Sequence, residues 1–185
     1  MIKKILLFSG LALVVILAAG LILRYNTKSL SPETSVVFEN GDLLITVFYN
    51  RPYKKDRVIF GGLVPFGKTW RTGANEATVF ETNKDLVIGG KKLKKGKYSL
   101  WTVPNEQSWL VVFNGTIPHW GIDVMRNGEA ARDQENDLLI IDVPVVITDK
   151  EIEQFTISLE KTDDVTELVL TWDKTLVTVS MSLSE

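Results

Sequence analysis

The sequence lacks cysteine altogether and contains a single histidine, His119, among its 185 residues. Without cysteine the chain has no disulfide bond, no thiol nucleophile, no cysteine–zinc site and no lipid anchor on cysteine. One histidine cannot build a multi-histidine zinc site, and no motif marks the activated serine that a catalytic triad requires. We therefore expect no metal and no cofactor, and look for function among other polar side chains.

Charge is absent from Ile5 to Leu23, a run of nineteen residues. A helix of this length spans about 28 Å, which is close to the thickness of the hydrocarbon core of a bilayer. Lys3 and Lys4 lie before the run, and Arg24 and Lys28 follow it. The run predicts one transmembrane helix that tethers the rest of the chain to a membrane.

A cleaved signal peptide is the alternative to an uncleaved anchor. Signals have a basic start, an apolar stretch of about 7–15 residues and a small-residue cleavage site, for which Ala18 and Gly20 are suitable. The apolar run is longer than a signal needs, which favours the anchor. If the positive end stays inside, either interpretation places the domain on the extracytoplasmic side of the membrane, or exports it when the signal is cut.

The chain after the apolar run is long enough for one domain with its own core. Its roughly 160 residues would bury about 70% of their unfolded surface without cross-links. We expect residues 1–24 to be the transmembrane anchor or signal, residues 25–32 a linker, and residues 33–185 a single β domain.

Short strand patterns recur through this domain, and no convincing helical stripe follows Arg24. Asn40-Gly41 is a hairpin signal between two β-rich runs, and Pro144 indicates an edge strand or a bulge. The runs cover residues 35–38, 43–49, 77–82, 86–88, 98–103, 109–113, 138–146, 155–159, 168–172 and 177–181. The pattern predicts an all-β fold, an antiparallel β-sandwich or a jelly-roll-like domain.

Two segments fall outside the strand pattern. Residues 50–57 form a polar stretch, and residues 116–136 form a long connection that includes His119 and Trp120. Long connections in compact domains are uncommon and are often functional. We interpret His119 as a hydrogen-bonded structural residue, with an acid–base pair between His119 and Glu76 as the alternative.

Charge of opposite sign is concentrated in different parts of the domain. Residues 51–97 carry 12 basic and 4 acidic side chains, whereas residues 98–185 carry 5 basic and 16 acidic ones. Because the overall excess is acidic, we do not expect nucleic acid as a partner. Five lysines crowd the segment 91–97, which we interpret as a solvated turn that discourages edge pairing, with contact to anionic lipid as the alternative.

The segment from Trp70 to Thr78 combines an indole, a cation, an amide and a carboxylate. A guanidinium, an amide and a carboxylate together can recognise hydroxyl, carboxylate or amide groups, and an indole offers a platform for a sugar ring or a cation. The same side chains also suit a structural role, in which Arg71 and Glu76 tie the loop to the core while Asn75 bonds to its own backbone.

This segment also carries a resemblance to a known family. The run Trp-Arg-Thr-Gly-Ala-Asn-Glu-Ala-Thr at residues 70–78 is similar to the signature of the bacterial family called domain of unknown function 2911. Further similarity lies at residues 51–52, 59–61, 63–68, 90–93, 96, 98–100, 104, 109, 113–114 and 120–121. The resemblance extends from about Ser31 to the end of the chain and implies an exported or envelope protein. It implies no activity, cofactor or catalytic residue. The long apolar N-terminus and the acidic connection at residues 132–137 depart from the family pattern.

These observations predict a membrane-tethered extracytoplasmic module that binds a small molecule, a glycan or an envelope protein without catalysis. The candidate contact residues are Arg51, Trp70, Arg71, Asn75, Glu76, His119 and Trp120. Two alternatives stay open: an envelope hydrolase that acts on glycans with Glu76 as its acid or base, and a purely structural envelope module. The hydrolase needs a second carboxylate, and the sequence does not identify one.

Overall fold

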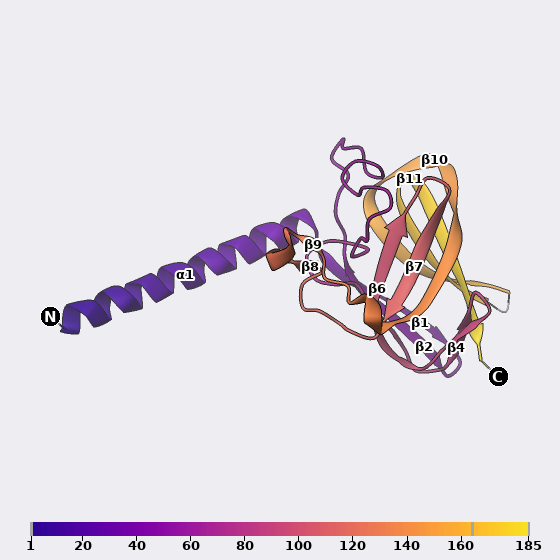
Figure 1. Cartoon of the computed structure of the whole chain (residues 1–185), viewed down its shortest axis with the longest axis horizontal. Helices are drawn as coiled ribbons and strands as arrows, with labels where there is room; N and C mark the ends of the chain where they lie inside the picture. Colours follow the sequence, from indigo (N-terminus) through magenta and orange to yellow (C-terminus); the bar gives the residue numbers. More distant parts are fainter. Residues whose placement is uncertain (1, 164, 185) are drawn as a thin grey trace.

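The chain consists of one long helix followed by a β domain (Figure 1). The computed structural model describes residues 2–163 and 165–184. Its elements are α1 (Ile2–Leu30), β1 (Glu33–Asn40), β2 (Leu43–Asn50), β3 (Val79–Thr82), β4 (Leu86–Ile88), β5 (Lys91–Leu93), β6 (Gly96–Pro104), β7 (Ser108–Asn114), β8 (Ile122–Asp123), η1 (Val124–Arg126), β9 (Glu129–Ala130), η2 (Gln134–Asn136), β10 (Asp137–Thr162) and β11 (Val165–Leu183). The prediction of a β domain behind one N-terminal helix is confirmed.

Helix α1 projects from the β domain, and its described apolar side chains, such as Leu17 and Leu21, are exposed. By length and composition its part Gly10–Leu30 fits a helix that crosses a membrane, and a signal sequence near the N-terminus has the same properties. The helix continues through residues 25–30, within the segment that the sequence marks as a linker. Pro32 has no N–H to extend the helix, and β1 begins at the next residue. Helix and domain are therefore joined by a very short connection.

Nine strands form one antiparallel sheet in the order β1-β2-β3-β6-β7-β10-β11-β4-β5, while β8 and β9 form a separate two-stranded sheet. The predicted hairpin between β1 and β2 is confirmed. Asn40 pairs with Leu43, so that Gly41 and Asp42 form the turn. Gly41 has φ 56°, a left-handed conformation that glycine adopts without steric cost.

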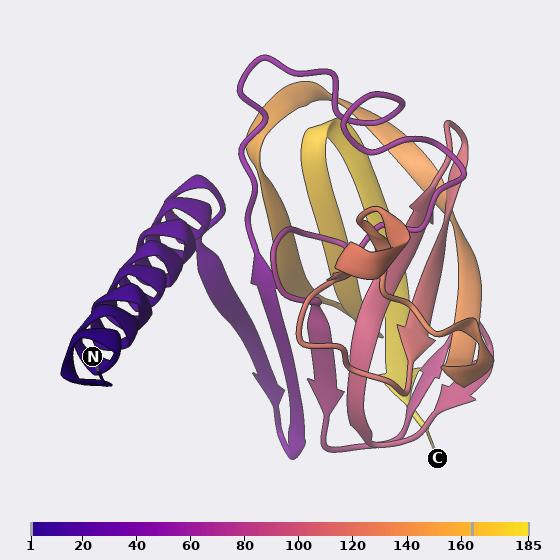
Figure 2. The same cartoon turned by 60° about the vertical axis from the view of Figure 1, so that its left-hand side comes forward.

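Strand β10 belongs to both halves of this sheet. Its first part pairs with β7 as far as Pro144, and its second part pairs with β11 from Val145 onward. Pro144 lies where the pairing partner changes, at the point where the sequence indicates an interruption. Irregular register between Ile147 and Thr156 accompanies the course of β10 around the domain. Figure 2 shows the result, a strongly curved sheet with α1 outside it and next to β1.

The polar stretch that follows β2 closes the curved sheet from the other side. Tyr53 forms a β-bridge with Gln154, and the backbone N–H of Phe155 donates to the carbonyl of Pro52 at 2.9 Å. The side chain of Arg51 donates from Nε to the carbonyl of Phe155 at 3.2 Å. The segment thus links the N-terminal hairpin to the second part of β10.

The core lies between the facing halves of the sheet, because alternate side chains of each strand point inward. In β2, for example, Ile45, Val47 and Tyr49 are buried, while Leu44, Thr46 and Phe48 are more exposed. The largest fully buried side chains are Trp101, Trp109, Trp172, Tyr49, Phe80, Phe113 and Phe155. A core of this size needs no disulfide bond, in agreement with the absence of cysteine.

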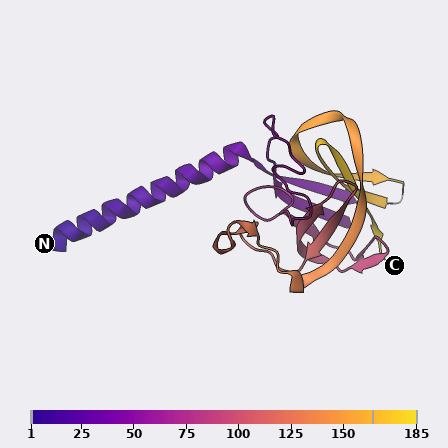
Figure 3. The ribbon, with the colours of Figure 1, turned by 45° about the horizontal axis from the view of Figure 1, so that its top comes forward.

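Two surface features occupy different ends of the domain. The lysine-rich hairpin of β4 and β5 lies away from α1 (Figures 1 and 2), and Lys92 and Lys94 pair there with Asp85. This position favours the interpretation as a solvated turn. The hairpin formed by β8, η1 and β9 instead projects on the side from which α1 leaves the domain (Figures 1 and 3).

Candidate functional site

The segment 70–78 forms a loop that is fixed at two points by isolated β-bridges. Trp70 pairs with Thr102 of β6, and Glu76 pairs with Trp120 of the long connection. The first bridge ties the loop to the sheet, and the second ties the long connection to the loop. The segment therefore joins two regions that lie far apart in the sequence.

Side chains within the loop hold its unusual backbone in place. Thr72 and Asn75 have φ of 54° and 55°, which is uncommon for a β-branched residue such as threonine. The hydroxyl of Thr78 donates to the carbonyl of Thr72 at 2.7 Å, and Nε1 of Trp70 donates to the carbonyl of Gly73 at 3.0 Å. These bonds compensate the backbone strain and set the direction of each side chain.

The indole of Trp70 packs into an aromatic cluster. It stacks on Trp172 with ring centroids 5.8 Å apart and an interplanar angle of 19°. It meets Phe155 edge-on at 4.9 Å, and Phe60 and Trp109 contact it from other sides. Trp70 thus anchors the loop to the core and does not offer an open platform to a sugar or a cation.

The carboxylate of Glu76 binds the end of α1. Nζ of Lys28 lies 2.6 Å from Oε2 of Glu76, 2.7 Å from Oε2 of Glu33 and 3.0 Å from Oδ1 of Asn50. Nδ2 of Asn50 donates to the same Glu76 oxygen at 3.0 Å. Three acceptors on the β domain therefore surround one ammonium group of the helix, an arrangement that we call the helix clamp (Lys28, Glu33, Asn50 and Glu76).

Asn75 extends the contact between the loop and the helix end. Its Nδ2 lies 3.4 Å from the carbonyl oxygens of Thr27 and Ser31, and 3.5 Å from Oδ1 of Asn50. The carbonyl of Thr27 also accepts from the backbone N–H of Ser31 at 3.1 Å, so the amide of Asn75 adds a second donor at the end of the helix. Asn75 acts as an external cap of α1.

Electrostatics favour the charged form of Glu76. Burial alone would raise the pKa of this carboxyl group, but the hydrogen bonds from Lys28, its own backbone and Asn50, together with the charge of Lys28, outweigh burial and lower the pKa below 4.5. The guanidinium of Arg24 lies 3.9 Å from Oε1 and adds a second cation. A general acid needs a raised pKa near neutral pH, so this environment suits an ion pair better than acid catalysis.

Arg71 lies beneath the long connection. Within the described part of the chain its guanidinium makes no hydrogen bond and no ion pair, and burial lowers the pKa of Arg71. A Cβ built on Gly121 would come within 2.7 Å of Cβ of Arg71. Position 121 therefore accommodates only glycine, because any other residue would place its Cβ against the aliphatic carbons of Arg71. The backbone N–H of Gly121 donates to the carbonyl of Asn75 at 3.1 Å, which holds the two segments together.

The structure brings some of the predicted contact residues together and separates others. Asn75 and Glu76 lie against the helix end, with Trp120 bridged to Glu76 and Arg71 under the neighbouring Gly121. Arg51 points toward β10, where its Nη2 donates to Oγ1 of Thr156 at 2.8 Å. His119 is exposed, and its ring lies 6.2 Å from that of Trp120.

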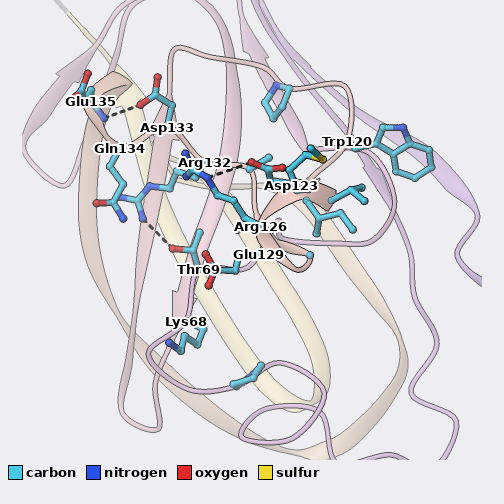
Figure 4. Close-up of a pocket in the computed structure, with 18 of the residues that line it drawn as sticks. Lys68, Thr69, Trp120, Asp123, Arg126, Glu129, Arg132, Asp133, Gln134 and Glu135 are labelled. Atoms are coloured by element: carbon cyan, nitrogen blue, oxygen red, sulfur yellow. Dashed lines mark hydrogen bonds and ion pairs between the residues drawn. The ribbon is translucent and has the colours of Figure 1, made fainter.

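A wide hollow of about 1440 Å³ opens beside this loop (Figure 4). One wall is residues 65–69, and the other is the long connection at residues 118–135. Arg132 donates to Thr69 across the hollow at 3.4 Å and pairs with Asp137, while Arg126 pairs with Asp123 at 3.4 Å. Other charged lining residues are Lys68, Glu129, Asp133 and Glu135. Trp120 stands at the edge of the hollow, apart from the other labelled residues (Figure 4).

Comparison with known families identifies the domain. A family model described as a protein of unknown function, DUF2911, matches residues 31–181. The chain belongs to the DUF2911 family. No curated protein and no solved structure matches the chain significantly.

The family match places the two sides of the helix clamp in different parts of the chain. Glu33, Asn50 and Glu76 lie within the DUF2911 domain, whereas Lys28 precedes the matched residues. The acceptors therefore belong to the DUF2911 domain, and the donor belongs to the helix attached to it.

Sequence reasoning missed several residues of this DUF2911 site. In the sequence Lys28 is only a flanking charge of the apolar run, and Asn50 is only the start of a polar stretch. A lysine one helical turn after Arg24, on the same face, is a weak signal for a contact with the domain. Among the described residues no group of three or more His, Cys, Asp or Glu side chains could hold a metal ion.

Proposed function

We propose that this DUF2911 protein is a membrane-anchored module that displays a binding hollow on the extracytoplasmic side of a bacterial membrane. In this proposal α1 stays attached as the anchor, and the hollow receives a peptide segment of an envelope protein. The single observation that carries the proposal is the open, charged hollow beside the helix clamp.

The properties of α1 support the anchor. The apolar side chains described in Gly10–Leu30 are exposed instead of packed against the domain, and an exposed apolar helix of this length is stable in a bilayer. The basic residues Lys3 and Lys4 favour an inside location for the N-terminus. The helix clamp holds only the end of α1 that follows Leu23, so the support for an uncut anchor comes from the length of the apolar run.

The shape and chemistry of the hollow support a peptide ligand. Small-molecule sites are concave, mostly apolar and about 300–1,000 Å³ in volume. This hollow is larger, open, and lined by exposed charges of both signs, among them Lys68, Glu129 and Glu135. Alternating charges and backbone groups of a peptide segment complement such a surface, whereas a glycan would call for exposed aromatic platforms across its floor. Trp120 lines only the edge.

Three of the seven residues named from the sequence lie near the hollow and have different roles in this proposal. Trp120 contacts the edge of the hollow, and Asn75 and Glu76 fix the backbone that carries it. Glu76 is engaged by Lys28 and does not line the hollow, so we favour binding over glycan hydrolysis. A structural role of the segment 70–78 in holding α1 is compatible with binding in the hollow.

The anchor and its orientation are tested on the full chain in bacterial cells. Because the chain has no cysteine, a Lys95→Cys variant offers a single exposed thiol on the β domain. We expect a membrane-impermeant maleimide to label it in spheroplasts, and the purified membrane fraction to hold a chain of full mass. Labelling only after lysis, or a chain shortened before residue 28, would contradict the anchor.

The hollow is tested with a displayed library of random twelve-residue peptides and the full chain in nanodiscs. Selected peptides should bind wild type and lose at least about tenfold in affinity to the Lys68→Glu/Glu135→Lys variant, because charge reversal disturbs complementarity. A Lys161→Glu variant, changed at an exposed position of β10, serves as the matched control. Equal affinity of the peptides for wild type and for the Lys68→Glu/Glu135→Lys variant would contradict the peptide site. Binding of soluble peptidoglycan glycan chains in place of peptides would contradict it as well.

A further inference from the structure

The two most exposed large apolar side chains of the described β domain are neighbours in η1. Met125 is 93% exposed and Val124 is 78% exposed, and Trp120, earlier in the same connection, is 46% exposed. Val124 and Met125 belong to η1, between β8 and β9, whereas Trp120 lies just before β8, and all three side chains line the rim of the hollow described above. Apolar side chains gathered at a projecting tip mark a surface that is covered by something else in function.

The hairpin projects on the side of the domain from which α1 leaves. Figures 1 and 3 show both features extending from the same side, although Figure 2 shows that they stand apart laterally. Two contacts connect them: Arg24 of α1 lies 3.9 Å from Glu76, and Glu76 forms a β-bridge with Trp120. Trp120 therefore lies close to the turn of α1 that contains Arg24.

Arg24 marks the level at which α1 would emerge from a bilayer. It is the first charged residue after the apolar run that ends at Leu23, and the exposed Tyr25 follows it. Tyrosine and tryptophan are enriched at the membrane–water interface. A bilayer that ends at this level would therefore have Tyr25 and Trp120 near its surface.

We propose that the β8–η1–β9 hairpin is a second membrane contact, in which Trp120, Val124 and Met125 enter the headgroup region of the bilayer that α1 crosses. This inference rests on the membrane anchor of the proposed function. The helix clamp fixes α1 relative to the domain, so the hairpin meets the membrane in one orientation. The DUF2911 domain then lies against the bilayer, with the hollow opening beside the membrane surface.

The charges of the hairpin indicate which lipid property matters. Asp123 and Arg126 pair with one another at 3.4 Å, and Glu129 adds a negative charge. A polybasic surface would require anionic lipid, but this hairpin has no excess of positive charge. The contact therefore depends on apolar burial, and we expect it on zwitterionic phosphatidylcholine and at high salt alike.

The full chain in phosphatidylcholine nanodiscs permits a direct test. Single-cysteine variants Met125→Cys, Lys95→Cys and Leu17→Cys receive the same fluorophore. We expect lipid-borne nitroxide to quench the label at position 125 at least about threefold more than the label at position 95, with the reverse order for aqueous iodide. A label-free measurement uses brominated phosphatidylcholine, which should quench wild-type fluorescence more than that of the Trp120→Phe variant.

The outcomes separate this inference from the anchor on which it rests. Suppose that lipid quenches the label at position 17, but iodide reaches the label at position 125 as readily as the label at position 95. This result would keep the anchor and overturn the hairpin contact. An iodide-accessible label at position 17 would overturn both. Quenching of the label at position 125 without quenching of Trp120 would also overturn the contact, because the native side chains would not reach lipid.

Discussion

Lys28 and Glu76 are 48 residues apart in the chain, yet Nζ of the lysine lies 2.6 Å from Oε2 of the glutamate. The lysine belongs to the apolar helix, and the glutamate belongs to the signature loop of the DUF2911 domain. Their ion pair connects the signature loop directly to helix α1. The predictions below test that connection and the packing around it.

Replacing Lys28 with methionine should loosen the helix clamp. The apolar stem is kept, but Glu33, Asn50 and Glu76 lose their shared donor. We expect a loss of about 1–2 kcal/mol in the free energy of unfolding, measured with urea in detergent micelles, because a part-buried charged group is left without its partner. Hydrogen exchange at residues 27–33 should rise. The exposed Lys161→Met control should change neither, and equal losses in both variants would contradict the clamp.

The clamp should weaken in acid. The pKa of Glu76 is lower in the folded state than its ordinary value of 4.5. Its stabilisation is therefore complete above that value and is lost as the pH falls through the depressed pKa. The stability difference between wild type and Glu76→Gln, measured by urea unfolding at pH 7 and at pH 3, should shrink at the lower pH. A constant difference at both pH values would show that the charge of Glu76 does not matter.

Gly121 and Arg71 should behave as a coupled pair. A Cβ on Gly121 would press on the stem of Arg71, so Gly121→Ala alone should cost about 1–3 kcal/mol of unfolding free energy. The double variant Arg71→Ala/Gly121→Ala removes Cγ and Cδ of the arginine and leaves only the contact with Cβ, so part of the loss should return. A double-mutant cycle measures this coupling, and strictly additive losses would show that the two residues do not touch.

Two tryptophans offer a comparison of packed and exposed side chains. Trp70→Ala removes the centre of the aromatic cluster and should cost about 3 kcal/mol. Trp120→Ala removes an exposed ring and should change stability in micelles by less than about 0.5 kcal/mol. Far-UV circular dichroism during urea unfolding measures both without relying on tryptophan emission. A large loss for Trp120→Ala would indicate a structural role for that ring.

The sequence was most informative where the pattern is local. Alternation at Val177, Val179 and Met181 predicts a strand with these side chains inward, and all three are buried. The hairpin at Asn40-Gly41 is predicted by its turn residues, although the turn lies one residue later. Local signals of this kind depend only on side-chain period and backbone freedom, which neighbouring residues determine.

Long-range relations were not available from the same reasoning. Pro144 indicates an interruption, but the exchange of β7 for β11 at that point depends on where two other strands lie. The polar neighbours of Trp70 predict a ligand platform, whereas the structure packs its ring against Trp172 and Phe155. The helix clamp joins a helix to a loop across dozens of residues, and no spacing rule connects them.

The closure of the sheet by residues 51–54 against β10 has a consequence for biosynthesis. Arg51 and its partner Phe155 are 104 residues apart, so this contact cannot form until most of the polypeptide has been made. Contacts of such large sequence separation slow folding, because the entropy of a long loop must be lost before they form. Until then residues 51–54 of the nascent chain lack their partners in β10, and the curved sheet stays open on that side. We expect this interval to be when the nascent protein is most vulnerable to aggregation and most dependent on a chaperone.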